Sequence, residues 1–362
     1  MRKSTIGYPW RIQFSVVGKT EGGVKIEAIE TCPTDAWDAF VRDHPDSTPF
    51  HTSAWHRVLR HGYGFPNKSL IATQDGDITG ILPLYLVRQP LGGRVLISAP
   101  QAVYGGALAK DVMVQSALEE QARAIAAQAG VAYLEIRGAG SVGEWHSLSH
   151  YATFRKTLPR QTCEVLGSIP RKQRAEVRKG EKLGLTVEVD TTLDRFYPIY
   201  ATSVHRLGSP VFPRRYAEGL MREFGEDCEI LTVTKNYEAI ASLLSLRHKG
   251  WAMPYHAGGT NKAMALSAFP VLYAAAMERA VQREDHGFDF GRSITGTGAF
   301  DFKRNFGFEP TPLTYRVALI RATQPPDMRP DNPRLKPIVA AWKMLPALIA
   351  NRLGPWVSRQ VV

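Results

Sequence analysis

The chain has 362 residues, a formal net charge of +11 and an isoelectric point near 9.6. This length favours two domains over one compact core, and a hydrophobic content of 44% is that of an ordinary globular protein. The excess of lysine and arginine favours an anionic partner, which is a nucleic acid, a phosphorylated carrier or an acidic membrane face.

The number and spacing of the three cysteines argue against a protein stabilised by disulfides or by a bound metal. Cys32, Cys163 and Cys228 are odd in number and far apart, which speaks against a disulfide framework and for a reducing compartment. None belongs to a C-x-x-C pair, so we expect no zinc or iron–sulfur site. The first residues lack the apolar run of a secretory signal, and no stretch approaches the ~20 apolar residues of a spanning helix. We therefore expect a cytoplasmic protein.

The first half of the chain reads as one mixed unit. Residues 1–26 form an N-terminal extension, and VKIEAIE (24–30) predicts a strand followed by a helix that begins at Thr34 or Asp35. Two strands are expected around the turn at 75–77, then a further strand at RVLISAP and a glycine-rich turn in VYGGALA. SALEEQARAIAAQAG (116–130) predicts a helix ended by Gly130, and VAYLEIRG (131–138) a buried strand.

The same order then returns in the second half. TCEVLG predicts a strand, and IPRKQRAEVRKGEKLG a basic helix with Ser168 as its cap. A strand, a helix, three strands and a long helix beginning near Pro270 follow, before the strands FDFG and PLTYRVALI. In each half the strand after the last helix runs into an arginine and a glycine, at 137–138 and 291–292. We interpret residues 27–160 and 161–323 as two copies of one α/β (α+β) unit.

The composition changes at residue 324. A proline-rich linker is followed by apolar residues at helical spacing, interrupted by Pro346 and Pro355. The segment 324–362 also carries six lysines and arginines. It can lie on an anionic membrane as a basic amphipathic tail, or it can pack its apolar edge on the second domain.

The stretch FDFGRSITGTGAFDFKRNFGFEP (288–310) is the first candidate site. Arg292 just past a strand suits a carboxylate or phosphate, Lys303 adds a point charge, and Ser293 and Thr297 add hydroxyls. The alternative is a polar hairpin in which Arg292 pairs with Asp289 or Asp301.

Three further sets of residues are candidates. Tyr255 and His256 end a strand before two glycines, and His256 could be a general base, although a lone histidine is more often structural. Trp55 belongs to an aromatic and basic cluster in the first half, for which packing is the default explanation. The basic helix presents a cationic face that could follow the phosphates of a nucleic acid or diphosphate carrier, or be a solvated surface: Arg171, Arg174 and Arg178.

The segment FDFGRS, its Gly/Thr loop and the following FKRNFGFEPTPLTY resemble the C-terminal signature of the FemAB-like acyltransferases. More narrowly, they are similar to FemAB-type proteins associated with PEP-CTERM exopolysaccharide systems. The resemblance implies two tandem GNAT-like domains (the N-acyltransferase-like fold) with mixed, largely antiparallel sheets. It also implies transfer of an acyl or aminoacyl group to an amine of an envelope or exopolysaccharide precursor. The anionic partner would be an aminoacyl-tRNA, another acyl donor or a diphosphate-linked saccharide, with possible peripheral contact at the inner membrane.

The residues argue against acetyl-CoA as the donor. The pyrophosphate-binding pattern R/Q-x-x-G-x-G/A matches only at residues 247–252, which form a turn between two strands and not the start of a helix. We expect no bound cofactor. Arg292 and Lys303 are assigned to anion binding or oxyanion stabilisation, and Asp289 or His256 to accepting the proton. The alternatives are a small-molecule N-acyltransferase using acyl-CoA or acyl-carrier protein, and a non-catalytic binding protein of a polysaccharide assembly complex.

Overall fold

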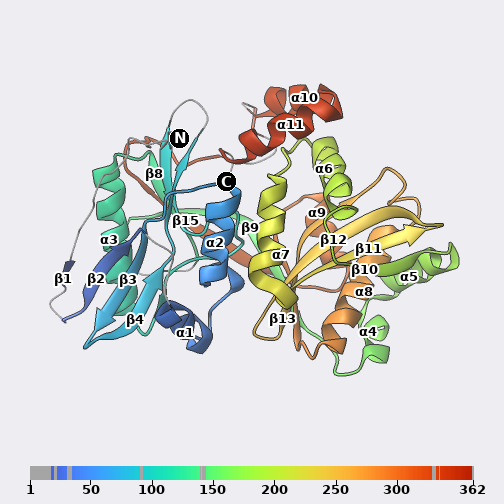
Figure 1. Cartoon of the computed structure of the whole chain (residues 1–362), viewed down its shortest axis with the longest axis horizontal. Helices are drawn as coiled ribbons and strands as arrows, with labels where there is room; N and C mark the ends of the chain where they lie inside the picture. Colours follow the sequence, from blue (N-terminus) through green and yellow to red (C-terminus); the bar gives the residue numbers. More distant parts are fainter. Residues whose placement is uncertain are drawn as a thin grey trace, which may run out of the picture.

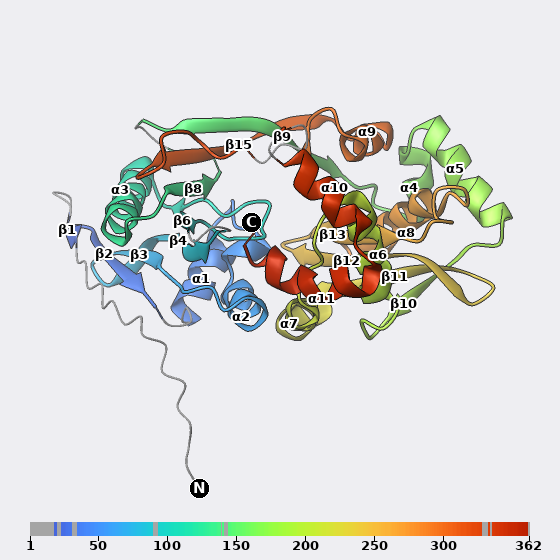
Figure 2. The ribbon, with the colours of Figure 1, turned by 90° about the horizontal axis from the view of Figure 1, so that it is seen from above.

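The computed structural model describes residues 18–19, 23–30, 35–89, 93–138, 140, 144–327, 332–333 and 335–360. The expected N-terminal extension lies largely outside the described residues, as does Cys32. Two lobes lie side by side, the first built mainly from the blue to green part of the chain and the second from the yellow and orange part (Figures 1 and 2).

A small antiparallel sheet lies at the outer edge of the first lobe. Its strand order is β1-β2-β3-β4-β7, with bounds β1 (Gly18–Lys19), β2 (Lys25–Ile29), β3 (Ser69–Gln74), β4 (Asp77–Leu82) and β7 (Leu108–Ala109). The helices of this lobe are α1 (Asp35–Asp43), α2 (Ser53–Gly62) and α3 (Val112–Ala129). Gly130 ends α3 in the left-handed conformation at φ +58°, as its sequence predicts.

A ten-stranded sheet runs through both lobes in the order β10-β11-β12-β13-β14-β9-β15-β8-β6-β5. The pairs β13–β14 and β6–β8 are parallel and the other pairs are antiparallel, so the sheets are mixed and mostly antiparallel, as expected. The strands are β5 (Tyr85–Arg88), β6 (Arg94–Ile97), β8 (Tyr133–Arg137), β9 (His146–Thr157), β10 (Thr186–Asp190), β11 (Cys228–Lys235), β12 (Glu238–His248), β13 (Trp251–Gly259), β14 (Gly287–Ile294) and β15 (Pro310–Leu319).

The last strand of each half lies beside a strand of the other half. β9, from the first half, pairs with β14 of the second, and β15, from the second half, pairs with β8 of the first. β9 and β15 also pair with each other at the centre of the sheet. The chain therefore crosses between its two halves twice, and the central strands belong to both.

The helices of the second half include one that the sequence analysis assigned wrongly. Residues 162–167 were predicted to form a strand and form α4 (Thr162–Ser168), because Val165 and Ile169 are buried at helical spacing in one core. Ser168 is not the cap of the basic helix α5 (Arg171–Lys182), whose N-cap is Pro170. The others are α6 (Phe196–Leu207), α7 (Arg214–Phe224), α8 (Ala268–Gln282) and α9 (Gly298–Asn305).

One hydrophobic core is shared by the two lobes. It joins Trp55 and Val87 of the first half to Tyr216, Leu244 and Tyr315 of the second, all nearly inaccessible to solvent. Burial of this apolar surface stabilises the arrangement of the lobes as well as each lobe.

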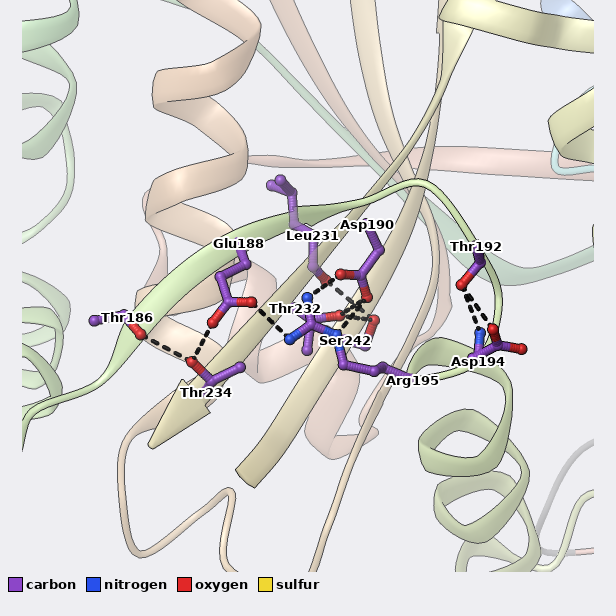
Figure 3. A network of polar contacts seen from close by, with 10 residues as sticks. All are labelled: Thr186, Glu188, Asp190, Thr192, Asp194, Arg195, Leu231, Thr232, Thr234 and Ser242. Atoms are coloured by element: carbon purple, nitrogen blue, oxygen red, sulfur yellow. Dashed lines mark hydrogen bonds and ion pairs between the residues drawn. The ribbon is translucent and has the colours of Figure 1, made fainter. Parts of the chain in front are cut away.

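Two polar arrangements hold strands in place. Arg316 of β15 forms a buried bidentate pair with Glu119 of α3, with N–O distances of 2.6 and 2.8 Å, which anchors the C-terminal strand to the first lobe. At the far edge of the second lobe, Arg195 contacts Asp190 and Glu188 of β10, and hydroxyls of the neighbouring strands complete the network (Figure 3).

The C-terminal tail forms two helices, α10 (Lys336–Met344) and α11 (Ala347–Ser358), separated at Pro346. Both pack on α6, and Nε2 of His205 donates to the carbonyl of Trp342 at 3.1 Å. The tail thus packs on the second half through one of its sides. Over the described residues, every helix is too short or too polar to cross a bilayer.

Candidate functional site

A cleft of about 760 Å³ opens between the two lobes. Its first wall comes from residues 45–51, the turn at 104–108 and the end of β8. The second wall comes from the β12–β13 turn, His286 and Asp289, with Arg155 of β9 between them. Both halves of the chain are therefore needed to form this cleft.

Asp289 is the buried carboxylate of the cleft, with 2% of its surface exposed. It accepts hydrogen bonds from the Tyr104 hydroxyl at 2.8 Å and from the backbone N–H of Gly291 at 2.7 Å. The guanidinium of Arg155 lies 3.4 Å away. Burial raises the pKa of Asp289, and the two hydrogen bonds and nearby cations oppose that rise. A carboxylate with a raised pKa at the wall of a cleft is a candidate proton acceptor.

A β-bulge aims Asp289 and Arg292 at the same side of the sheet. The pairing of β14 with β9 shifts register between these two residues, and Gly291 adopts φ +64°. Asp289 pairs with Arg155 and Arg292 with Thr153, which are two residues apart on β9 and so share a face. Without the bulge, residues three apart on a strand would point to opposite faces.

Lys303 of α9 stabilises this bulge. Its ammonium donates to the carbonyls of Phe290, Gly291 and Arg292 at 2.7, 3.2 and 2.9 Å, which uses all three of its protons. Burial lowers the pKa of Lys303 to about 7. Thr297, expected to contact substrate, is the N-cap of α9 and accepts from the N–H of Phe300. Lys303 does not line the cleft.

Arg292 lies behind the cleft wall, against two tyrosines. Nη1 donates to the Tyr315 hydroxyl at 2.9 Å, and the guanidinium lies 5.0 Å from the Tyr151 ring. Arg137, its counterpart in the first half, lies 5.3 Å from the same Tyr315 ring and does line the cleft. Among the described residues no carboxylate pairs with Arg292, because Asp289 pairs with Arg155 and Asp301 with Arg304.

His256 and its aromatic neighbours lie outside the cleft lining. Burial lowers the pKa of His256 to about 3, so the ring is neutral, and its Nε2 has no hydrogen-bond partner among the described residues. Tyr255 donates to the carbonyl of Gln101 at 2.7 Å and joins the two lobes. Trp55 is fully buried with its ring edge-on to Phe50. These contacts favour packing for Trp55 and Tyr255.

The basic helix and Ser293 also lie outside the cleft lining. Arg171 and Arg178 are exposed on α5, while Arg174 donates to the carbonyl of Gly167 at 3.4 Å. α5 packs on α8 at the end of the second lobe that faces away from the first (Figures 1 and 2). Ser293 is buried in β14 opposite Ala152.

Sequence reasoning missed the partners of Asp289. The Tyr104 hydroxyl bridges Asp289 and Thr153, with a 2.5 Å contact to the threonine, and Arg155 lies 3.9 Å from the centre of the Trp251 ring. The glycine-rich turn that follows Tyr104 could have indicated that Tyr104 belongs to the site. No sequence feature indicated Thr153 or Arg155, because the strand that carries them was not predicted.

Two histidines of the cleft are held neutral. Burial lowers the pKa of His51 and of His248 to about 4. Nδ1 of His51 accepts from the N–H of Thr48, so Nε2 carries the proton that it donates to the Gly106 carbonyl. In the part of the chain that the structure describes, no three His, Cys, Asp or Glu residues form a group that could hold a metal ion.

Comparison with known proteins assigns the second half to an enzyme class. Residues 169–304 match the family described as acetyltransferase (GNAT) domain. This segment is similar to the acetyltransferase domains of the GNAT type, and the match indicates an N-acyltransferase. No curated protein matches the chain in sequence.

Solved structures share the fold over most of the chain. The crystal structure of FemX has a TM-score of 0.62 at 14% identity, with 82% of this chain and 98% of that chain covered. A tandem GNAT protein from the clavulanic acid biosynthesis pathway has a TM-score of 0.54 at 13% identity, covering 84% and 100%. The C-terminal domain of a putative lysylphosphatidylglycerol synthetase from Agrobacterium fabrum has a TM-score of 0.52 at 12% identity, covering 78% and 90%. The chain has the tandem GNAT architecture.

Proposed function

We propose that this protein transfers an acyl or aminoacyl group to an amine, in the manner of the FemAB-like enzymes. The acceptor that we favour is a precursor of the cell envelope or of an exopolysaccharide, in line with the resemblance to PEP-CTERM-associated proteins. The observation that supports the proposal best is Asp289, a buried carboxylate fixed by Tyr104 and Gly291 at the wall of a cleft between two GNAT-like lobes.

The chemistry assigned to Asp289 is proton transfer from the attacking amine. The amine nitrogen attacks the carbonyl carbon of an ester or thioester, a C–N bond forms, and the C–O or C–S bond breaks. Asp289 accepts the proton that the nitrogen loses, and the leaving alcohol or thiol takes up a proton in turn. The raised pKa of Asp289 brings its basicity closer to that of a base acting near neutral pH.

Anion binding in this scheme falls mainly to Arg155, which lines the cleft. Its side chain is about half-exposed over Trp251 and can reach a carboxylate or phosphate of the donor or carrier. Arg137 also lines the cleft, but its guanidinium is buried and bonded to Glu135 and to the carbonyls of Ala99 and Ala102. Arg292 and Lys303 lie outside the cleft lining and act by positioning the groups that they contact. Arg292 donates to Tyr315, and Lys303 fixes the bulge that positions Asp289.

The test measures transfer directly by mass spectrometry. Purified protein is incubated with aminoacylated tRNA, acyl-CoA or acyl-carrier protein, each with amine-bearing envelope precursors. The masses of the products are then measured. Asp289→Asn keeps the shape and removes the base, so we expect at least about a hundredfold loss of turnover with an unchanged melting temperature.

The matched control is Asp301→Asn, since Asp301 is exposed and forms a surface ion pair with Arg304. Product with acyl-CoA or acyl-carrier protein alone would favour the small-molecule N-acyltransferase. Absence of any product, together with an unaltered polysaccharide in cells lacking the protein, would favour the non-catalytic alternative. Full activity of Asp289→Asn would refute the role given to this carboxylate.

A further inference from the structure

The outward face of the C-terminal helix α11 is apolar and cationic, which is the reverse of an ordinary surface helix. Ile349, Leu353 and Trp356 recur at i, i+4 and i+7, and so share one face. Their exposed fractions are 47%, 44% and 66%, and neighbouring Leu348 is 87% exposed. A globular protein normally turns such side chains inward.

The opposite face of α11 explains why the apolar residues cannot turn inward. Ala350, Gly354 and Ser358 recur every four residues and are buried. A Cβ atom at Gly354 would lie 2.8 Å from a methyl of Val211, so only a glycine allows this close approach. The small residues therefore determine which side of α11 packs on the body of the protein. The large apolar side chains, on the opposite side, face the solvent.

The preceding helix α10 extends the same surface. Ile338 and Met344 are 64% and 85% exposed, whereas Val339 faces Gly208 of the body. Together the two helices present Ile338, Met344, Leu348, Ile349, Leu353 and Trp356, a set that we call the tail patch. Large apolar side chains exposed in this number on two neighbouring helices are typical of an interaction site.

The charges around the tail patch indicate its partner. Residues 335–360 contain Lys336, Lys343, Arg352 and Arg359, all exposed, and no aspartate or glutamate. Arg352 lies on the same face of α11 as Leu348 and Trp356, four residues from each. The stem of Lys343 packs on Gly208 and the guanidinium of Arg359 lies near Gly64, so their exposed charges border the patch. Lysine and arginine stems can lie along apolar surface while their charges reach phosphates, and tryptophan favours the bilayer interface.

A second copy of the chain fits this surface poorly. A symmetric dimer through the tail patch would bring Arg352 close to its own copy, with the other cations nearby, and residues 335–360 hold no acid to neutralise them. An anionic bilayer supplies both the apolar layer and the negative charge. We propose that the tail patch docks this protein on a membrane surface containing anionic lipid, with α10 and α11 lying in the plane of the interface. This surface is independent of the cleft chemistry.

The experiment is co-sedimentation of the full chain with vesicles of phosphatidylcholine, with or without one quarter phosphatidylglycerol. We expect binding to the anionic vesicles that falls when salt rises from 0.05 to about 0.5 M, because salt screens the cationic residues. The double variant Leu348→Ser, Trp356→Ser should lose about tenfold or more in binding. Lys343→Gln with Arg352→Gln should lose binding mainly at low salt.

Matched controls exist for both pairs. Met113 and Met264 are 76% and 77% exposed outside the tail, and their double serine variant should bind like the wild type. Arg171→Gln with Arg178→Gln makes the same change of charge on α5. Sedimentation of the wild type that equals that of the Leu348, Trp356 variant would overturn the proposal.

Two other outcomes would also overturn it. One is equal binding to neutral and anionic vesicles. The other is a dimer in solution, seen by light scattering, that the Leu348, Trp356 variant abolishes. Unchanged melting temperatures and unchanged transfer to a water-soluble acceptor in that variant would show that a loss of binding is separate from fold and from catalysis.

Discussion

Asp289 illustrates how a single residue depends on groups that are distant in sequence. Its carboxylate is fixed by Tyr104, 185 residues earlier, and by the N–H of Gly291 two residues later. The sequence alone identified Asp289, Arg292 and Lys303 as a set because they cluster in one segment. It could not identify Tyr104 or Arg155, since only the folded sheet brings them to this place.

Lys303 offers a test of how strongly burial acts on one charge. Its pKa is about 7 in the folded protein and about 10.5 in an unfolded chain, so between these values the unfolded state binds more protons. The free energy of unfolding should therefore rise with pH across this window relative to Lys303→Met, which does not titrate. Chemical denaturation of both proteins at pH 6.5 and pH 9.5 measures the difference.

The same comparison has a clear negative result. If the wild type and Lys303→Met show the same change of stability with pH, the ammonium at 303 is not desolvated in the folded protein. Lys303→Arg serves as a control, because a guanidinium keeps its charge over the whole window.

At the scale of elements, regular periodicity was predicted well, but one strand of the candidate site, β9, was not. The helix α3 and its glycine end, the strand β8 and the basic helix α5 agree with the patterns in the sequence. The central strand β9 was missed, because HSLSHYATFRKT carries Tyr151, Thr153 and Arg155 on the face toward the site and lacks apolar alternation. A strand that carries several polar side chains for a site loses the apolar alternation from which strands are predicted.

The bulge in β14 is an element whose role can be separated from its stability. Gly291→Ala forces a Cβ into the left-handed region and should cost about 1 kcal/mol of stability. We also expect a large loss of transfer activity, because the aim of Asp289 changes. Denaturation curves and the mass-spectrometric assay report the two effects.

Gly296→Ala is the matched comparison. Gly296 has φ +80° and nothing within 4 Å of an added Cβ, but it lies in the loop before α9. The stability cost should be similar, and activity should be retained. If both variants lose activity equally, the bulge has no special role in aiming the carboxylate.

At the scale of the whole molecule, the two halves are joined by the pair of Arg316 and Glu119. Their side chains are 8% and 4% exposed, so Arg316→Met leaves a buried carboxylate without its cation. We expect a loss of about 3–5 kcal/mol, seen as a lower denaturation midpoint by circular dichroism. Arg304→Met, at an exposed pair with Asp301, should change stability by less than about 1 kcal/mol.

The transition itself should be informative in that experiment. Because β15 completes the first lobe and one core spans both lobes, we expect a single cooperative transition in the wild type and in Arg316→Met. Two separate transitions would contradict a shared core.

The exchange of β9 and β15 also governs when the protein can fold during its synthesis. When the ribosome has made the first 160 residues, β8 can pair with β6 but still lacks its second neighbour, β15, which is encoded at residues 310–319. An uncovered strand edge of this kind invites pairing with other chains. We therefore expect the nascent first half to expose this strand edge until almost the entire polypeptide has emerged.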